Sequence, residues 1–161
     1  MEKNKLVKNE TNELLQLISF ELNDEVFGID IKAVQEIIRL MPITKVPNSP
    51  DFVDGMINIR GRVIPVINLR CRMGMMGKEH DNSTRIIVVE LMGNTTGFIV
   101  DAVNEVLRIP VSITEAPPEI VAGVNSEYIK SVGKLEDRLL ILIDLEKILT
   151  VNERLELQSC N

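Results

Sequence analysis

The side chains that could do chemistry in this 161-residue sequence are few and scattered. The only histidine, His80, lies in a polar stretch without cysteines or paired carboxylates at metal-ligand spacing, so we expect a solvated loop residue. Asp51 and Asp54 could act as an acid–base pair, but they fall in an expected one-turn helix at residues 49–55, where aspartate favours capping. Phosphate-binding and nucleophile-elbow signatures are absent from the sequence. We therefore predict no enzymatic activity, no metal and no cofactor.

Composition restricts the classes of partner. The net charge is −6 and only 3% of residues are aromatic, whereas a nucleic-acid binder needs cationic surface and stacking rings. The sequence has neither a signal-peptide pattern nor a run of about 18 apolar residues, so we expect a cytoplasmic protein without direct membrane insertion. Cys71 and Cys160 are far apart and are expected to be reduced thiols.

The sequence repeats itself. Residues 17–40 align without a gap on residues 86–109, and 8 of these 24 positions are identical, where roughly one or two would match by chance. The match resumes where residues 62–69 align with residues 138–145. Glu36 recurs as Glu105, each followed by two apolar residues and an arginine. We read Glu36 as functional, whereas Glu105 could equally be an outward-facing strand residue.

Each copy contains the same succession of short elements. A strand at 18–22 or 87–91 is followed by a polar turn (Asn23-Asp24 or Gly93-Asn94), a strand from Gly28 or Gly97, a strand at 36–40 or 105–109, a proline-containing loop and two apolar runs. This pattern predicts a mostly β fold of two small barrels, formed by the pseudo-repeats at about 17–70 and 86–146, with strand exchange between them possible.

Helix is expected only in short pieces. One piece is the turn at 49–55, and a second is a C-terminal helix from Asp144. Residues 1–12 are expected to be a flexible arm, residues 13–152 the folded domain and residues 153–161 a tail. A single copy is marginal in size, so we expect the two barrels to share an apolar seam, with a groove where they meet. The methionine-rich residues 73–77 could be an adaptable contact surface, but a linker between the copies is favoured.

The stretch INIRGRVIPVINL, residues 57–69, has charged residues at a tight turn between two apolar runs. Gly61 supplies the positive φ that such a hairpin turn requires. Arg60 beside it could be a solvated turn charge. Alternatively, the alternation of side chains would let its guanidinium lie against Glu36 or a partner's carboxylate in a two-point contact, which is typical of recognition.

Three segments resemble the CheW family of chemotaxis coupling proteins: FGIDIKAVQEII, SPDFVDGMINIRGRVIPVINLR and GFIVDAVNEVLRI. The family motif G-x-x-N-x-R-G-x-x-x-P-x-x-D/N-L is matched by Gly55, Asn58, Arg60, Gly61, Pro65, Asn68 and Leu69. The resemblance spans about residues 14–150 and implies two SH3-like barrels that share a hydrophobic core. Asn68, where aspartate is common, and Ala102, where glycine is common, depart from the family pattern.

The resemblance also implies a function and a set of site residues. The family role is that of a non-enzymatic adaptor that couples the cytoplasmic tips of methyl-accepting chemoreceptors to the histidine kinase CheA, whose regulatory domain has the same fold. The protein would then be recruited to membrane-associated receptor arrays. Carried over by motif, a receptor-binding groove would be lined or supported by Val34, Glu36, Gly55, Arg60, Val103 and Val106, and Ile120 would contact the kinase ring.

Three other readings stay open at this point. A CheV-like coupling domain would carry a receiver domain, for which this chain has no room. A small-barrel nucleic-acid-binding protein would conflict with the acidic composition, and an enzyme would need an uncharted constellation around Glu36, Glu105 or His80.

Overall fold

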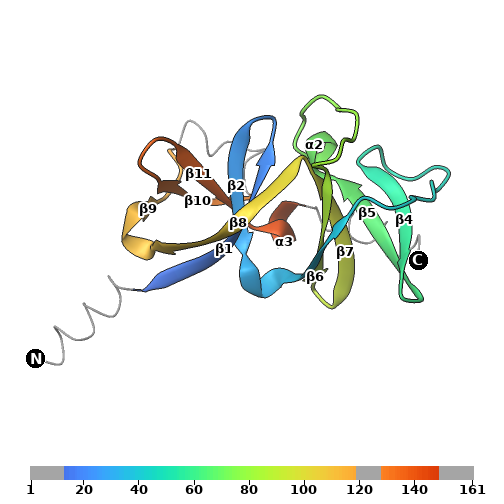
Figure 1. The fold of residues 1–161 in the computed structure, drawn as a ribbon, viewed down its shortest axis with the longest axis horizontal. Coiled ribbons are helices and arrows are strands. Elements are labelled where there is room, and N and C mark those ends of the chain that lie inside the picture. The colour runs from blue at the N-terminus through green and yellow to red at the C-terminus, as the bar shows by residue number, and fades with distance from the viewer. Residues whose placement is uncertain (1–12, 119–127, 149–161) are drawn as a thin grey trace, which may run out of the picture.

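The structure, a computed structural model, describes residues 13–118 and 128–148, and these form two β-sheets (Figure 1). The six-stranded sheet has the order β8-β1-β2-β11-β10-β9. Its strands are β1 (Leu14–Leu22), β2 (Glu25–Asp30), β8 (Ala102–Pro110), β9 (Thr114–Glu115), β10 (Ile129–Lys134) and β11 (Leu139–Ile143). The mostly β, barrel-like fold expected from the sequence is confirmed.

The five-stranded sheet has the order β3-β6-β7-β5-β4. Its strands are β3 (Val34–Arg39), β4 (Val53–Ile59), β5 (Arg62–Asn68), β6 (Arg85–Leu91) and β7 (Asn94–Val100). The helical segments of the described residues are short. Two are 3-10 turns, η1 (Ile31–Ala33) and η2 (Val111–Ile113), and two are α-helices, α2 (Leu69–Arg72) and α3 (Leu145–Ile148).

The sequence repeat is visible in the strand order of the two sheets. Strands β3, β6, β7, β5 and β4 of one sheet correspond to β8, β1, β2, β11 and β10 of the other, in the same spatial order. Each sheet contains strands of both copies, because the β1–β2 hairpin joins the second copy and the β6–β7 hairpin joins the first. Neither barrel therefore consists of one pseudo-repeat. Each combines strands of both copies, because the two copies exchange a hairpin. In both sheets the exchanged hairpin is joined to a strand of the other copy through a parallel strand pair, which is β2–β11 in one sheet and β7–β5 in the other.

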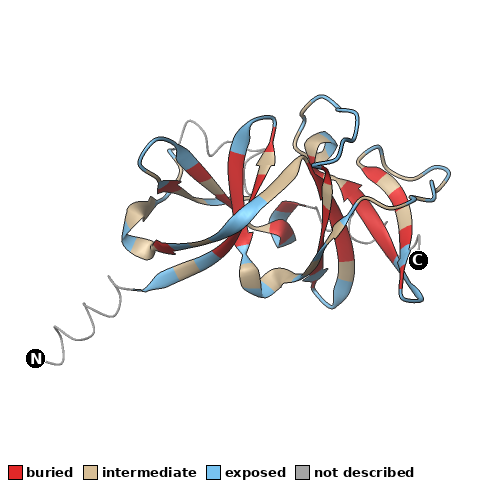
Figure 2. Cartoon of the chain, in the orientation of Figure 1, coloured by how far each residue is buried: buried red, intermediate tan, exposed pale blue. Residues whose placement is uncertain are grey.

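Three apolar clusters form the core, and the middle one lies between the sheets. Strand β6 contributes to two of these clusters, because successive side chains of a strand point to opposite faces. Ile87, Val89 and Leu91 point into the central cluster, whereas Ile86 and Val88 point into the interior of the five-stranded barrel. Figure 2 shows buried segments, drawn in red, on strands of both sheets. The central cluster consists of Ile18, Phe20, Leu22, Phe27, Ile29, Val53, Ile67, Leu69, Ile87, Val89, Leu91, Phe98, Val100, Ile143, Leu145 and Ile148. The shared core is thus confirmed.

Some local expectations need correction. The one-turn helix at residues 49–55 is wrong, because two turns lead directly into β4 at Val53 and Gly55 is part of that strand. The β6–β7 turn is centred on Met92-Gly93 rather than Gly93-Asn94. The short helix α2 was not predicted, although Asn68 caps it by accepting a hydrogen bond from the Cys71 amide at 3.2 Å.

The C-terminal helix expected from Asp144 is present as α3 as far as Ile148, and its continuation lies outside the described residues. The N-terminal arm at 1–12, the tail at 153–161, Cys160 and Ile120 also lie outside them. Cys71 is a free, exposed thiol.

Candidate functional site

The β4–β5 hairpin turn presents Arg60 to solvent. Arg60 and Gly61 are its two central residues, with φ of 50° and 83°, as in a type I′ turn. Asn58 stabilises the turn, because its side-chain oxygen accepts a hydrogen bond from the Gly61 amide at 2.9 Å. A positive φ is unfavourable for arginine, so the hairpin holds this residue against its own backbone preference. The result is an arginine side chain that is 73% exposed yet fixed at its base.

Glu36 lies on β3 and forms an ion pair with that guanidinium, from Arg60 Nη2 to Glu36 Oε2. The strand has a β-bulge between Val34 and Glu36, so Val34 is opposite Val89 and Glu36 is opposite Val88. Val89 belongs to the central cluster and Val88 to the barrel interior. The bulge therefore turns Glu36 toward the mouth of the five-stranded barrel. The contact with Arg60 is one of the two alternatives that the sequence left open.

Two of the three candidate valines border the central cluster, one from each sheet. Val34 on β3 and Val103 on β8 are partly buried against it. Val103 is opposite Phe20 in the strand register, and Val106 is opposite Ile18. Val106 is 49% exposed. We call Val34, Val103 and Val106 the valine rim; they lie on β3 and β8, which are edge strands of the two sheets.

Gly55 has a supporting place in β4 rather than a surface one. It is buried, has φ of 146°, and stands where an added Cβ would lie 2.2 Å from the Thr44 carbonyl oxygen. Thr44 pairs with Met56, and this bridge holds the loop between β3 and β4 against the sheet. Of the six candidates, the structure therefore brings Glu36 and Arg60 into contact, packs Val34 and Val103 against the central cluster, leaves Val106 half exposed and places Gly55 beneath a loop.

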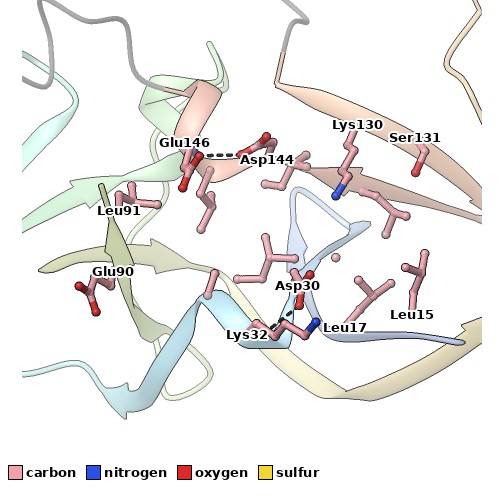
Figure 3. A pocket seen from close by; sticks show the side chains of 16 residues that line it. Leu15, Leu17, Asp30, Lys32, Glu90, Leu91, Lys130, Ser131, Asp144 and Glu146 are labelled. Atoms are coloured by element: carbon pink, nitrogen blue, oxygen red, sulfur yellow. Dashed lines mark hydrogen bonds between the residues drawn. The ribbon is translucent and has the colours of Figure 1, made fainter. Parts of the chain in front are cut away.

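A cleft of about 440 Å³ lies where the two sheets meet (Figure 3). Its walls come from β1, β2, β10 and β11 of one sheet, from Glu90 and Leu91 of β6 in the other, and from η1 and α3. Apolar side chains such as Leu17 and Leu142 line it together with charged ones that include Asp30, Lys32, Lys130 and Glu146.

The cleft matches the groove that the duplication predicted, but none of the six candidates lines it. The cleft comes near one candidate, Val34, because the preceding residue, Ala33, lines it. Sequence reasoning missed its charged lining residues. Asp30 and Lys32 lie inside FGIDIKAVQEII but not at a site position carried over from the family, and no motif surrounds Lys130 or Glu146.

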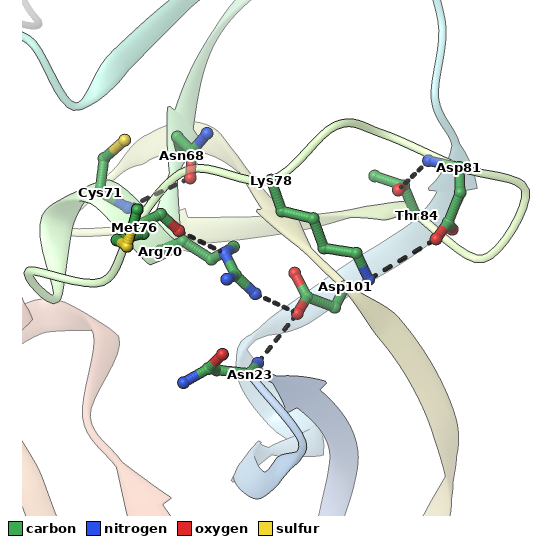
Figure 4. Close-up of polar contacts among 9 residues, drawn as sticks. All are labelled: Asn23, Asn68, Arg70, Cys71, Met76, Lys78, Asp81, Thr84 and Asp101. Carbon is green, nitrogen blue, oxygen red and sulfur yellow. Dashed lines mark hydrogen bonds and ion pairs between the residues drawn. The ribbon is translucent and has the colours of Figure 1, made fainter.

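A polar junction holds the two sheets together at Asp101, between β7 and β8 (Figure 4). The Asp101 carboxylate accepts hydrogen bonds from Arg70 Nη1 at 2.5 Å and from the Asn23 amide at 2.9 Å, while its own amide donates to the Glu21 carbonyl. Arg70 is on α2 of the first copy and Asn23 in the β1–β2 turn. This junction ties the crossing from β7 to β8 to the β1–β2 hairpin and to α2.

The other residues that could do chemistry stand apart. His80 is exposed in a loop, as expected. Within 13–118 and 128–148, no three or more His, Cys, Asp or Glu side chains gather closely enough to hold a metal ion. Asp54 is half-buried, and burial raises the pKa of its carboxyl, against the opposing effects of His80, Asn68 and Lys45. No helix in the described part of the chain is long and apolar enough to span a bilayer.

Comparison with known proteins identifies the family. A family model for the CheW-like domain matches residues 16–153. The chain belongs to the CheW family. It is 36% identical over 138 residues to the chemotaxis protein CheW of Klebsiella aerogenes. This match covers 86% of this chain and 83% of that protein. Among solved structures it resembles the scaffolding protein TtCheW of Thermoanaerobacter tengcongensis, with a TM-score of 0.80, 37% identity and coverage of 88% and 96% of the two chains.

A comparison within the wider family bears on the CheV-like reading. The chain is 30% identical over 128 residues to the chemotaxis protein CheV3 of Helicobacter pylori, but the match covers only 41% of that protein. The CheW proteins are covered almost along their whole length, so the CheV-like alternative is not favoured.

Proposed function

We propose that this chain is a non-enzymatic cytoplasmic adaptor that couples methyl-accepting chemoreceptors to the histidine kinase CheA in a chemotaxis array. Membership of the CheW family and the likeness to a scaffolding protein support a scaffold role. The observation that carries the receptor contact is the valine rim, where Val106 is half exposed although its partner across the strand pair, Ile18, belongs to the central cluster.

The proposed receptor surface combines this rim with the Glu36–Arg60 pair. The apolar face of an amphipathic helix would remove the valines from water, as in other helix-in-groove contacts. The two opposite charges would set the register of the helix and disfavour wrong partners. A surface of this modest size suits roughly micromolar binding, about −8 kcal/mol, and many such links in an array would strengthen it through effective concentration.

The kinase contact is proposed from the resemblance alone. Its partner would be the regulatory SH3-like domain of CheA, and Ile120 is the proposed contact residue. Because Ile120 lies outside the described residues, the experiment below treats kinase binding as a separate readout.

The test is co-sedimentation of the protein with a receptor cytoplasmic fragment and, separately, with the CheA regulatory domain. Val106→Asp should weaken receptor binding about tenfold or more, because it places a charge in an apolar contact. Leu139→Asp is the matched control, since Leu139 is 59% exposed and lies on β11, away from the rim. Both variants should keep the wild-type circular dichroism spectrum.

Val34→Asp extends the test to the buried side of the rim. We expect it to reduce receptor binding more than kinase binding. Equal loss of both activities would indicate general unfolding, and wild-type receptor binding by Val106→Asp would contradict the proposed surface.

A further inference from the structure

Two arginines face each other across the β3–β6 strand pair. Arg39 is the last residue of β3 and Arg85 is the first of β6, and they are direct partners in the antiparallel register. Side chains at such positions leave the same face of a sheet with Cβ atoms about 4.5–5.5 Å apart. Like charges placed this way repel each other, so the pair is unfavourable unless an anion lies between them. The arrangement is notable in a chain with a net charge of −6.

The two guanidiniums differ in how they are held. Arg85 is half-buried, and its Nη1 donates to the Asn82 carbonyl at 2.7 Å and to the Thr84 carbonyl at 2.9 Å. These bonds fix the guanidinium and leave Nη2 and Nε for another acceptor. Arg39 is exposed, and its side chain makes no hydrogen bond or ion pair with the part of the chain that the structure describes.

Both arginines line an open hollow of about 630 Å³. His80 lies on its wall and adds an imidazole donor, and Thr84 lines it as well. The one carboxylate of the wall, Asp81, already has its partners: Lys78 Nζ at 3.6 Å and the Ser83 amide at 2.7 Å (Figure 4 shows the contact with Lys78). It therefore makes no ion pair with either arginine.

The second copy of the fold provides an internal comparison. Arg108 on β8 occupies the position that corresponds to Arg39, but its partner across the strand pair is Gln16, which corresponds to Arg85. The repeat thus conserves one strand arginine in both barrels and adds the second only in the five-stranded one. Pairing of the two charges is therefore not a requirement of the barrel itself.

From this geometry we propose that Arg39 and Arg85, with His80, form a binding site for a phosphate group, either inorganic phosphate or a phosphate monoester. Two adjacent guanidinium forks present N–H donors to several oxygens of a tetrahedral anion, whereas a planar carboxylate is satisfied by one fork. The site goes beyond the proposed adaptor role and does not depend on it.

The experiment is a titration of the ¹⁵N-labelled full chain with inorganic phosphate, followed by NMR shifts of the arginine Nε–H groups, against sodium chloride at equal ionic strength. We expect saturable shifts at Arg39 and Arg85 with phosphate only. Arg39→Gln should weaken binding about tenfold, because it removes a charge-assisted contact from an exposed side chain. Arg108→Gln removes the same charge from the corresponding position and should bind phosphate like the wild type.

A second titration with phenyl phosphate identifies the source of the phosphate group. Tighter binding than inorganic phosphate assigns the site to a monoester, and equal binding assigns it to the free anion. Arg85→Lys, which keeps the charge but loses the fork, should also weaken binding while the backbone amide spectrum stays native. Shifts that rise linearly, that chloride reproduces, or that persist unchanged in Arg39→Gln would overturn the proposal.

Discussion

The ion pair between Arg60 and Glu36 joins the two opposite edges of the five-stranded sheet. Glu36 is on β3 at one edge, and Arg60 is in the turn that ends β4 at the other. The Thr44–Met56 bridge connects the same two edges through the loop after β3. The pair that we propose for receptor recognition is therefore also part of the closure of this barrel, and its two roles need separate measurements.

Arg60→Ala should leave the fold intact while weakening receptor binding. The exposed pair contributes less than about 1 kcal/mol to the free energy of unfolding, and Ala at a positive φ costs about as much as Arg. Binding to the receptor fragment should fall about three- to fivefold, because the charge that orients the helix is lost. Urea denaturation and co-sedimentation measure the two effects.

Arg62→Ala is the matched control for this prediction. Arg62 belongs to the same hairpin but donates to the Thr95 hydroxyl at 2.7 Å instead of pairing with Glu36. It should bind the receptor fragment at wild-type strength. Capture of Arg60→Ala at wild-type strength would argue against a recognition role, and a loss of several kcal/mol in stability would show that the pair is mainly structural.

Gly55→Ala should destabilise the fold strongly. Its Cβ would meet the Thr44 backbone at 2.2 Å, and backbone cannot move aside as a side chain does, so we expect a loss of at least about 3 kcal/mol. Gly61→Ala also places a side chain at a positive φ, of 83° against 146° at Gly55, but has open space around the added Cβ, and should cost only about 1–2 kcal/mol. Equal losses in thermal or urea unfolding would show that the close approach to Thr44 carries no extra cost.

Much of this architecture could be predicted because the chain is duplicated. The repeat located β1, β2, β6 and β7, and the shared core follows from two copies that are each too small to be stable alone. The exchange of hairpins was only a possibility in the sequence, since equivalent strands have similar side chains in both copies and do not specify which copy they pair with. The chain crosses between the two sheets at η1 and at Asp101.

The candidate site was predictable only where a side chain has a local signal. The turn at Arg60-Gly61 is evident from the glycine between apolar runs, and its contact with Glu36 followed from strand alternation as one alternative. The bulge at Val34–Glu36 separates these two residues onto different faces, and a one-residue irregularity leaves no periodic signal. The expected helix at 49–55 was wrong because Gly55 serves a close strand contact and not a helix end.

Asp101→Ala should loosen the junction between the sheets. Its carboxylate is only 14% exposed and Arg70 only 12%, so the substitution leaves a guanidinium with little water around it and an unpaired Asn23 amide. Such losses cost about 3 kcal/mol. Lys78→Ala, which removes an exposed partner of Asp81, should change stability by less than about 0.5 kcal/mol.

The coupling within this junction can be measured in a double-mutant cycle. Because Arg70 and Asp101 share one interaction, the double variant Arg70→Ala with Asp101→Ala should lose clearly less stability than the sum of the two single variants. Additive losses in urea unfolding would show that the two residues stabilise the chain independently.

Asp54→Asn should stabilise the protein at neutral pH. Burial raises the pKa of Asp54 in the folded chain, so the folded state holds its proton more tightly than the unfolded state does. Ionisation at neutral pH therefore opposes folding, and this cost disappears as the pH falls below about 4, where both states are protonated. The amide keeps an acceptor for the Asn68 side chain, which donates to Asp54 at 3.5 Å.

The gain from Asp54→Asn should be small, up to about 0.5 kcal/mol at pH 7, because the group is only partly buried. It should shrink as urea unfolding is repeated toward pH 4. Asp51→Asn makes the same charge change at an exposed position three residues earlier and should show no comparable gain at pH 7. A stabilisation by Asp54→Asn that is equal at both pH values would mean that shape or hydrogen bonding, and not the buried charge, sets the difference.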